Sequence, residues 1–372
     1  MEKENNCTFK REIGVDLLRI IATVFVIILH VLGPSGILEQ RDLGITYWTA
    51  WFFEIFAYCA VNCFALITGY VMVNKQIKIK NIVTTWLQVA FTSIIFSLLF
   101  FVFDPQTISL KQIVVSVIPI IGKQWWYMSS YFALFFFIPF LNAAIKNISR
   151  NMFNKFILVI LFAICVIDCI MPMDAFLFNN GYSPIWLMVL YLFGAYIKTF
   201  NIKEKITAVK SLMGFMVMIV ITFLSKAVIS YLTQRILHRV VFDGILISYT
   251  SITIVFAAVF LFTFCLNIKI GNITYKIIEF LAPTTLGIYL IHTHPLIYTN
   301  IIKAKLIPIM DKTLVSMIVA LFTLTLVIFI ACALIEKIRI FIFKILKVKG
   351  FAEFIENKTK KFLTSLQSIK NK

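Results

Sequence analysis

The chain has 372 residues, of which 61% are hydrophobic and only 14% are charged. A soluble domain usually carries about 25% charged residues, and 38 phenylalanines are more than one water-soluble core of this length can hide, so the composition excludes a soluble protein. The formal net charge of +18 also occurs in nucleic-acid-binding proteins. Here, however, the basic residues lie mostly between long apolar segments, which indicates contact with an anionic membrane surface and no nucleic-acid partner.

A helix needs about 20 mostly apolar residues to cross a bilayer. The segments that meet this requirement are residues 13–33, 48–73, 82–103, 124–142, 154–171, 183–200, 211–232, 246–267, 277–301 and 313–335. The ninth of them contains Pro283 and Pro295, which favour a broken helix. The sequence therefore predicts an all-α fold, a polytopic integral membrane bundle of about ten transmembrane helices joined by short loops.

The distribution of lysine and arginine among the loops predicts the orientation of this bundle. Basic residues concentrate in the N-terminal tail and around the loops after the even-numbered segments: Lys3, Lys10, Arg11, Lys75, Lys78, Lys80, Lys146, Arg150, Lys155, Lys198, Lys203, Lys205, Lys210, Lys269 and Lys276. The loops after the odd-numbered segments hold fewer, except the ninth, which contains Lys303, Lys305 and Lys312. Both termini are therefore expected in the cytoplasm, and the loop around Asp174 outside.

The two ends of the chain carry further expectations. The first apolar segment is long, contains Asp16 and Arg19 and precedes no small-residue cleavage site, so we expect a retained helix and not a signal peptide. A transmembrane domain is assigned to residues 1–336. Residues 337–372 form a basic cytoplasmic tail that alternates apolar and basic residues. Two interpretations fit this tail, an amphipathic helix on membrane lipid at the inner leaflet and a solvated basic segment.

The cysteines do not predict a metal site. Cys59 and Cys63, and likewise Cys165 and Cys169, are four positions apart and share a helix face. Neither pair has nearby His or Cys residues at zinc-ligand spacing, so both are expected to pack between helices.

Ionisable side chains inside membrane spans are costly and therefore mark candidate functional sites. The spans of this chain contain Asp16, Arg19, His30, Glu54, Asp168, Lys226, His292 and His294. From the assigned ends, the last six lie in the outer part of the membrane. This predicts a polar cavity open toward the outside, unless several of them sit at the membrane surface.

The first span carries three of these residues on nearly one face. Asp16 and Arg19 are three positions apart and can pair, which is compatible with a purely structural pair near the inner surface. His30 follows Arg19 by eleven positions, about three turns or roughly 16 Å along the helix. A histidine in a helix is often a packing residue, but an imidazole is also suited to general base catalysis because its ordinary pKa is near neutrality.

Four stretches of the sequence carry a family resemblance. The segment REIGVDLLRIIATVFVIILH resembles the first helix of acyltransferase family 3, in which Asp, Arg and His have the spacing of Asp16, Arg19 and His30. FALITGY is similar to the Phe-rich Ser-Gly-Tyr/Phe stretch of that family, with Thr68 where Ser is usual. WWYMSSYFALFFFIPFLN resembles its Trp-aromatic-Leu helix. TLGIYLIHTHP resembles its late Tyr-Leu-x-His segment and places His292 at the histidine position.

This resemblance implies a membrane-embedded O-acyltransferase of a bacterial plasma membrane. Such an enzyme moves an acyl group, most simply acetyl from acetyl-CoA as co-substrate, to a hydroxyl of a cell-envelope polysaccharide or lipid-linked sugar. It implies that His30 is the general base, or carries the acyl group transiently, that Asp16 and Arg19 organise the donor, and that His292 orients His30 or stabilises the oxyanion. Candidate substrate-binding residues are Glu54, Lys226 and Trp126. No metal is expected.

Two features limit the transfer of family properties to this chain. After Gly69 and Tyr70 the family often has an arginine-rich cytoplasmic segment that ends in proline, whereas this chain has only lysines there. Some members of the family also append an extracytoplasmic esterase-like domain, which we do not expect here. A transporter or flippase for a lipid-linked glycan, and a non-catalytic membrane subunit of a glycan synthase, are the alternative functions, although a transporter more often shows internal repeats.

Overall fold

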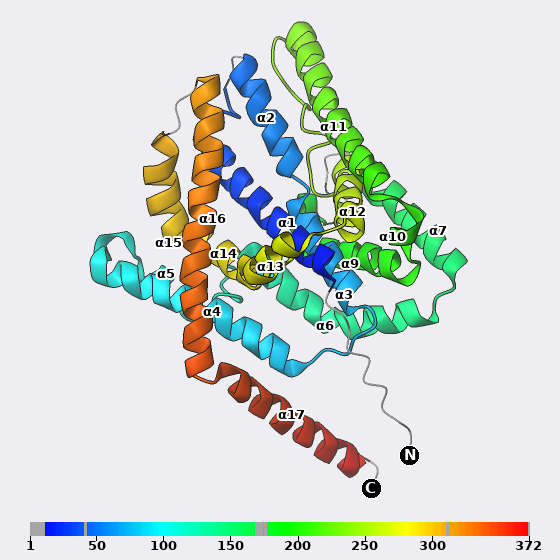
Figure 1. Ribbon diagram of the computed structural model, residues 1–372, viewed down its shortest axis with the longest axis vertical. Coiled ribbons are helices and arrows are strands. Elements are labelled where there is room, and N and C mark those ends of the chain that lie inside the picture. The colour runs from blue at the N-terminus through cyan, green and yellow to red at the C-terminus, as the bar shows by residue number, and fades with distance from the viewer. Residues whose placement is uncertain (1–11, 41–42, 168–173, 175–176, 310–312, 371–372) are drawn as a thin grey trace.

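The computed structural model describes residues 12–40, 43–167, 174, 177–309 and 313–370 (Figure 1). Over these residues the chain forms helices and turns and contains no strand. The α-helices are α1 (Ile13–Leu32), α2 (Ile45–Ala57), α3 (Ala60–Met72), α4 (Ile79–Phe103), α5 (Leu110–Val117), α6 (Trp126–Asn147), α7 (Arg150–Ile160), α9 (Pro184–Thr199), α10 (Ile202–Lys205), α11 (Ala208–Leu237), α12 (Ile252–Asn267), α13 (Asn272–Leu281), α14 (Thr285–His292), α15 (Pro295–Ile297), α16 (Leu314–Ile345) and α17 (Val348–Lys370).

Shorter turns of other helical types connect several of them. The 3-10 turns are η1 (Gly33–Ser35), η2 (Pro105–Thr107), η4 (Asn179–Gly181), η5 (Ala282–Thr284) and η7 (Ile307–Ile309). Two π-helical stretches are η3 (Leu161–Ile167) and η6 (Tyr298–Leu306).

The helical membrane bundle predicted from the sequence is confirmed. Within the described parts of the chain, 6 helical segments are long and apolar enough to cross a membrane: Ile13–Ser35, Ile45–Met72, Ile79–Phe103, Trp126–Asn147, Ala208–Leu237 and Leu314–Ile345. Two shorter apolar helices, α9 and α12, occupy the predicted spans 183–200 and 246–267. The total of about ten spans and the cytoplasmic position of the termini remain predictions.

Two predicted spans are interrupted, and both interruptions lie beside the candidate site. The span 48–73 consists of α2 and α3, which meet at Tyr58 and Cys59. The span 277–301 is divided into α13, η5, α14, α15 and η6, with breaks at Pro283 and Pro295, because proline lacks a backbone donor and blocks a continuous helix. Irregular backbone inside a membrane is tolerated where it is buried in protein or lines a cavity. For the span 154–171, α7 and η3 cover residues up to 167, and Asp168 and Cys169 lie outside the described residues.

Helix α1 lies in the middle of the bundle (Figure 1) and contacts α2, α3, α12, α13, α14 and α16. Its side chains Leu18, Ala22, Ile27, Val31 and Leu32 are fully buried. A helix that is covered on several sides presents its few polar groups to protein and not to lipid. The Asp16, Arg19 and His30 side chains therefore face the interior of the bundle.

Helices α3 and α9 cross in direct backbone contact. A Cβ atom on Gly69 would lie 2.0 Å from the carbonyl oxygen of Tyr191, and a Cβ atom on Gly194 would lie 2.0 Å from that of Leu66. Membrane helices approach this closely through small residues, because lipid supplies no hydrophobic force to hold them together. The two glycines thus fix the Phe64–Tyr70 stretch against α9.

Several segments that the charge pattern assigns to the cytoplasm contact one another. Lys80, in the first turn of α4, donates from its side chain to Glu353 of α17 at 2.9 Å and from its backbone N–H to Glu356 at 3.1 Å. Glu12, just before α1, accepts from Lys198 at 3.4 Å and from Lys203 at 3.1 Å. The predicted inner ends of the spans therefore meet in two groups, each held together by ion pairs.

The expected boundary at residue 336 falls inside a helix, and the assignment of residues 337–372 as a cytoplasmic tail stays a prediction. Helix α16 continues past residue 336 to Ile345, and the separate helix α17 then runs beneath α4 (Figure 1). Its exposed apolar side chains are Phe351, Phe354, Phe362 and Leu363. Their attachment to the inner leaflet stays a prediction.

Topology can be checked directly. We expect a tag after Lys372 to be inaccessible from outside intact cells and a tag inserted at Asp174 to be accessible, because lysine and arginine are retained on the cytoplasmic side. Protease or antibody accessibility, with and without permeabilisation, measures both positions. A C-terminal tag that is labelled in intact cells would contradict the predicted orientation.

Candidate functional site

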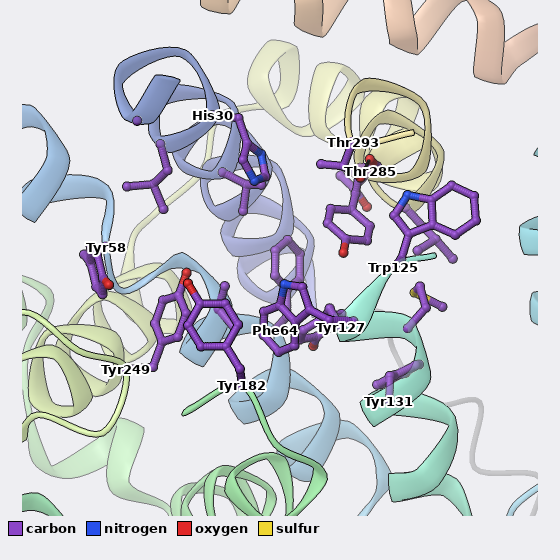
Figure 2. A pocket seen from close by; sticks show the side chains of 18 of the residues that line it. His30, Tyr58, Phe64, Trp125, Tyr127, Tyr131, Tyr182, Tyr249, Thr285 and Thr293 are labelled. Carbon is purple, nitrogen blue, oxygen red and sulfur yellow. Dashed lines mark hydrogen bonds between the residues drawn. The ribbon is translucent and has the colours of Figure 1, made fainter. Parts of the chain in front are cut away.

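A cavity of about 850 Å³ lies beside α1, between α3, α6 and α14 (Figure 2). We call it the chamber. Its polar lining residues are Arg19, His30, Glu39, Glu54, Tyr58, Thr68, Gln124, Trp125, Trp126, Tyr127, Tyr131, Tyr182, Tyr249, Thr285, Tyr289, Thr293, Tyr298 and Lys303. Its aliphatic lining is mainly Val, Leu and Ile from α1 and α3. Three of the predicted site residues from different helices, His30, Glu54 and Trp126, therefore face one space.

His30 and His292 form a direct pair across two helices. His30 lies near the end of α1, and His292 is the last residue of α14, 262 positions later. The His30 Nδ1 atom is 3.1 Å from the His292 Nε2 atom. His292 is fully buried, whereas His30 is half-buried and lines the chamber. His292 thus reaches the chamber only through His30.

The hydrogen bonds of His292 fix the tautomers of both neutral rings. The His292 Nδ1 atom lies 2.6 Å from the carbonyl oxygen of Ile288, which can only accept, so Nδ1 carries the hydrogen. The His292 Nε2 atom then accepts, and the His30 Nδ1–H group donates to it. This leaves the lone pair of His30 on Nε2. The arrangement holds an imidazole beside the chamber in the tautomer that a general base requires.

The Asp16 and Arg19 side chains pair at the opposite end of α1. The Arg19 Nη1 atom donates to the Asp16 carboxylate at 2.7 Å, and Asp16 is only 2% exposed. Arg19 lines the chamber and also a second cavity of about 440 Å³, which we call the vestibule. The vestibule is further lined by Glu12, Asp16, Tyr70, Asn74, Lys75 and Lys198. Arg19 therefore stands where the two cavities adjoin.

Glu12 is held by cations at the mouth of the vestibule. Burial opposes its ionisation, but hydrogen bonds from Lys203 and Tyr70 and the charge of Lys198 outweigh burial and hold the pKa of Glu12 below its ordinary value. An ionised Glu12 offsets part of the positive charge of the vestibule. The Glu12 carboxylate is paired with Lys198 and Lys203, so a bound anion would compete with Glu12 for these lysines.

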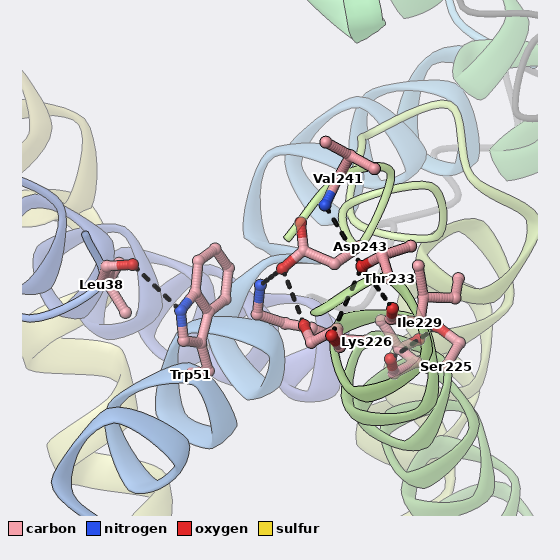
Figure 3. A network of polar contacts seen from close by, with 10 residues as sticks. Leu38, Trp51, Ser225, Lys226, Ile229, Thr233, Val241 and Asp243 are labelled. Atoms are coloured by element: carbon pink, nitrogen blue, oxygen red, sulfur yellow. Dashed lines mark hydrogen bonds and ion pairs between the residues drawn. The ribbon is translucent and has the colours of Figure 1, made fainter. Parts of the chain in front are cut away.

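Lys226 lies outside the chamber, in a polar network between α11, α2 and the loop before α12 (Figure 3). It is 2% exposed and forms an ion pair with Asp243, and its Nζ atom lies 3.6 Å from the centre of the Trp51 ring. The Trp51 indole in turn donates to the carbonyl of Leu38 at 3.2 Å. These contacts connect three segments, and they favour a structural role for Lys226 over substrate contact.

His294 is also placed apart from the histidine pair. Its ring is 1% exposed and contacts Trp125 and Phe96, with centroid distances of 5.7 Å to each. Six titratable groups are predicted at a similar depth in the membrane. Of these, His30 and Glu54 line the chamber, and His292 contacts His30 from outside the chamber lining. Lys226 and His294 lie elsewhere, as described above, and Asp168 lies outside the described residues.

The chamber is rich in tyrosine, which the search for ionisable residues missed. Seven of the 13 tyrosines of the chain line it, whereas of 38 phenylalanines only Phe64 does so within the described residues. Tyrosine combines an apolar ring with a hydroxyl that seeks a hydrogen-bond partner. The choice of tyrosine over phenylalanine inside apolar spans was therefore the available sequence signal for a polar ligand.

Comparison with known proteins identifies the chain at the level of its family. A family model described as an acyltransferase domain, that of acyltransferase family 3, matches residues 12–337. This match covers nearly the whole chain and includes both histidines of the pair, Arg19 and Glu54. No curated protein matches the chain, and no solved structure does.

Proposed function

Since the chain belongs to acyltransferase family 3 and the resemblance of its motifs is thereby confirmed, we propose that it is a membrane O-acyltransferase of a bacterial plasma membrane. It moves an acyl group, acetyl in the first instance, from acyl-CoA to a hydroxyl of a cell-envelope glycan or lipid-linked sugar. The observation that carries this proposal is the His30–His292 pair, which presents His30 to a tyrosine-rich chamber that adjoins a cationic vestibule.

The donor enters from the vestibule. Arg19, Lys75 and Lys198 supply positive charge there, which suits the phosphates of a coenzyme A thioester. The phosphates displace Glu12 from the lysines, and the acyl end extends past Arg19 into the chamber. Because Arg19 and His30 are roughly 16 Å apart on one helix, the donor spans this distance while its nucleotide part stays at the cytoplasmic end.

The transfer step uses His30 as the base. Its Nε2 lone pair accepts the proton of the acceptor hydroxyl while the hydroxyl oxygen attacks the thioester carbonyl carbon. The carbon–sulfur bond breaks, the ester forms, and the proton passes from His30 to the departing thiolate. His292 acts by orientation, because one of its nitrogens is bonded to Ile288 and the other to His30, and neither remains for an oxyanion.

Purified protein in detergent or nanodiscs, incubated with acetyl-CoA labelled in the acetyl group, tests the proposal. We expect release of free CoA and transfer of label to a membrane glycan or lipid-linked sugar extract, with both signals abolished in His30→Ala. Translocation of a lipid-linked glycan in proteoliposomes, with no CoA release from any acyl-CoA, would contradict the proposal and favour a flippase.

Arg19→Lys is expected to reduce acyl transfer by at least about tenfold while the protein stays folded. The ammonium keeps the charge beside Asp16 but lacks the planar fork that binds anionic oxygens in pairs, and a hydrogen bond to a charged group contributes about 1.5–3 kcal/mol. The rate is measured against acetyl-CoA concentration in membranes matched for protein level.

Arg150→Lys provides the control for the same chemical change. Arg150 is the first residue of α7, and its guanidinium packs on the ring of Phe200. Because this contact is away from both cavities, the Arg150→Lys variant should retain wild-type activity. Full activity of Arg19→Lys would exclude the contact between Arg19 and the donor.

A further inference from the structure

One end of the chamber is lined by Tyr58, Tyr182 and Tyr249 (Figure 2). Together with Trp126, which packs on Tyr182, these residues form what we call the aromatic wall. Ring centroids are 4.5 Å apart for Trp126 and Tyr182, 5.1 Å for Tyr182 and Tyr249, and 5.0 Å for Tyr58 and Tyr249. These rings come from the junction of α2 and α3, from α6, and from two separate loops. The wall is therefore built by four distant parts of the chain and faces the same space as His30.

Glu54 of α2 lies against this wall without a cation. Its side chain lines the chamber, is only 8% exposed, and has one carboxylate oxygen that lacks any hydrogen-bond partner among the described residues. Tyr58 follows Glu54 by one helical turn at the end of α2, and Tyr182 and Tyr249 line the same chamber. No described lysine, arginine or histidine forms an ion pair with it. A buried carboxylate without a partner is unfavourable, so its partner is expected to arrive with a ligand.

The cations that line the chamber do not supply that partner. Arg19 is paired with Asp16, and Lys303 is an exposed residue of η6. The faces of aromatic rings also carry negative electrostatic potential, which attracts cations. The wall and Glu54 therefore prefer the same sign of charge. A neutral sugar can stack on the wall and donate hydroxyl hydrogen bonds to the carboxylate, but it leaves the negative charge uncompensated.

The protein contains a filled site of the same composition. Lys226, the only lysine with less than 9% exposure among the described residues, is held by the Asp243 carboxylate and by the face of Trp51. The ring of Tyr47 also faces this ammonium group, with 5.7 Å between the Lys226 Nζ atom and the ring centre. A carboxylate with Trp and Tyr rings thus binds an ammonium group in one part of this bundle. Glu54 with Trp126 and the tyrosines repeats these components beside an open space.

We propose that Glu54 and the aromatic wall bind a positively charged amino group of the acceptor, so that the acceptor is an amino sugar with a free amine and a hydroxyl that reaches His30. This inference rests on the proposed function, because it names the substrate class of the same site. Glu54 pairs with the ammonium, the sugar ring stacks on the wall, and the hydroxyl to be acylated points to the His30 Nε2 atom.

Binding of two matched probes tests the inference without an acyl donor. Methyl glucosaminide and methyl glucoside differ only at C2, which carries an amino group in the first and a hydroxyl group in the second. Their affinities for the purified protein are measured by quenching of tryptophan fluorescence. We expect the wild type to bind the amine at least about tenfold more tightly than the neutral glycoside. In Glu54→Gln the preference disappears while neutral glycoside binding is retained, which also shows that the variant is folded. Glu204→Gln, an exposed change on α10, keeps the preference.

Equal affinities of the wild type for the two glycosides would overturn the inference, even if Glu54→Gln failed to fold, and so would a preference that survives in Glu54→Gln. Acyl transfer to both probes is scored in parallel. A preference for the amine without any transfer contradicts the proposed function alone, whereas transfer to both probes with equal affinities contradicts the amino-sugar inference alone.

Discussion

Replacing His30 with alanine is expected to reduce acyl transfer by at least about a hundredfold. A positioned general base contributes roughly a hundred- to ten-thousand-fold to a rate, and His30 is the only histidine that lines the chamber within the described residues. Its Nδ1–H group is committed to His292, which leaves Nε2 as the atom that can accept the acceptor proton. Acyl transfer is measured in membranes matched for protein level.

The other two histidines of the site region serve as graded controls. His292→Ala should lower the rate less than His30→Ala, because the base remains but its tautomer and orientation are no longer fixed. His292→Asn should recover part of the loss, since its amide oxygen can accept from the His30 Nδ1–H group. His294→Ala should be mild, because that ring contacts Trp125 and Phe96 and not His30. A His30→Ala rate above about a tenth of wild type would contradict the assignment of His30 as the base.

The arrangement along a single helix could be predicted from the sequence, because helical geometry relates spacing to position. Asp16, Arg19 and His30 lie on one helix, and the predicted Asp16–Arg19 pair is confirmed. The breaks at Pro283 and Pro295 follow from the chemistry of proline in the same way. Each of these predictions depends on neighbours within a few turns.

Contacts between helices could not be predicted in this way. Lys226 and Glu54 were indistinguishable as isolated charges in apolar spans, but packing gives Lys226 the partner Asp243 from a loop and leaves Glu54 beside the chamber. The aromatic wall depends on Tyr182 and Tyr249, which the structure places in loops just before α9 and α12. Their convergence follows from the tertiary arrangement and from no local pattern.

A second network explains how α14, which carries His292, is held in place. Glu336 of α16 is fully buried and accepts from Gln88 of α4 at 3.0 Å and from Arg339 at 2.6 Å. Its carboxyl group lies directly against the backbone of α14 at Gly287, where an added Cβ would be only 2.0 Å from the Glu336 Cδ atom. Gly287 is five positions before His292 in the same helix. A shift of α14 at this contact would therefore change the His292–His30 distance.

Gly287→Ala is accordingly expected to destabilise the protein by about 1–3 kcal/mol, the usual effect of overpacking, and to lower acyl transfer by at least about tenfold. This expected destabilisation is opposite in sign to the usual effect of a Gly→Ala change in a helix interior, where alanine is favoured over glycine by about 0.5–1 kcal/mol. Thermal unfolding of the detergent-solubilised protein and the transfer rate measure the two effects. Gly350→Ala, at an exposed position of α17 where no atom from outside its own helical turns lies within 4 Å of the added Cβ, should be neutral or stabilising.

Shortening Glu336 tests whether the contact itself is responsible. Glu336→Ala alone leaves the guanidinium of Arg339 without its partner in a largely buried position, which typically costs about 3–5 kcal/mol. It also removes the atoms that an alanine at position 287 would meet. The double variant should therefore be less destabilised than the sum of the two single variants, because the steric part of the Gly287→Ala effect is absent. Additive effects, or a Gly287→Ala protein as stable as Gly350→Ala, would show that α14 is not positioned through Glu336.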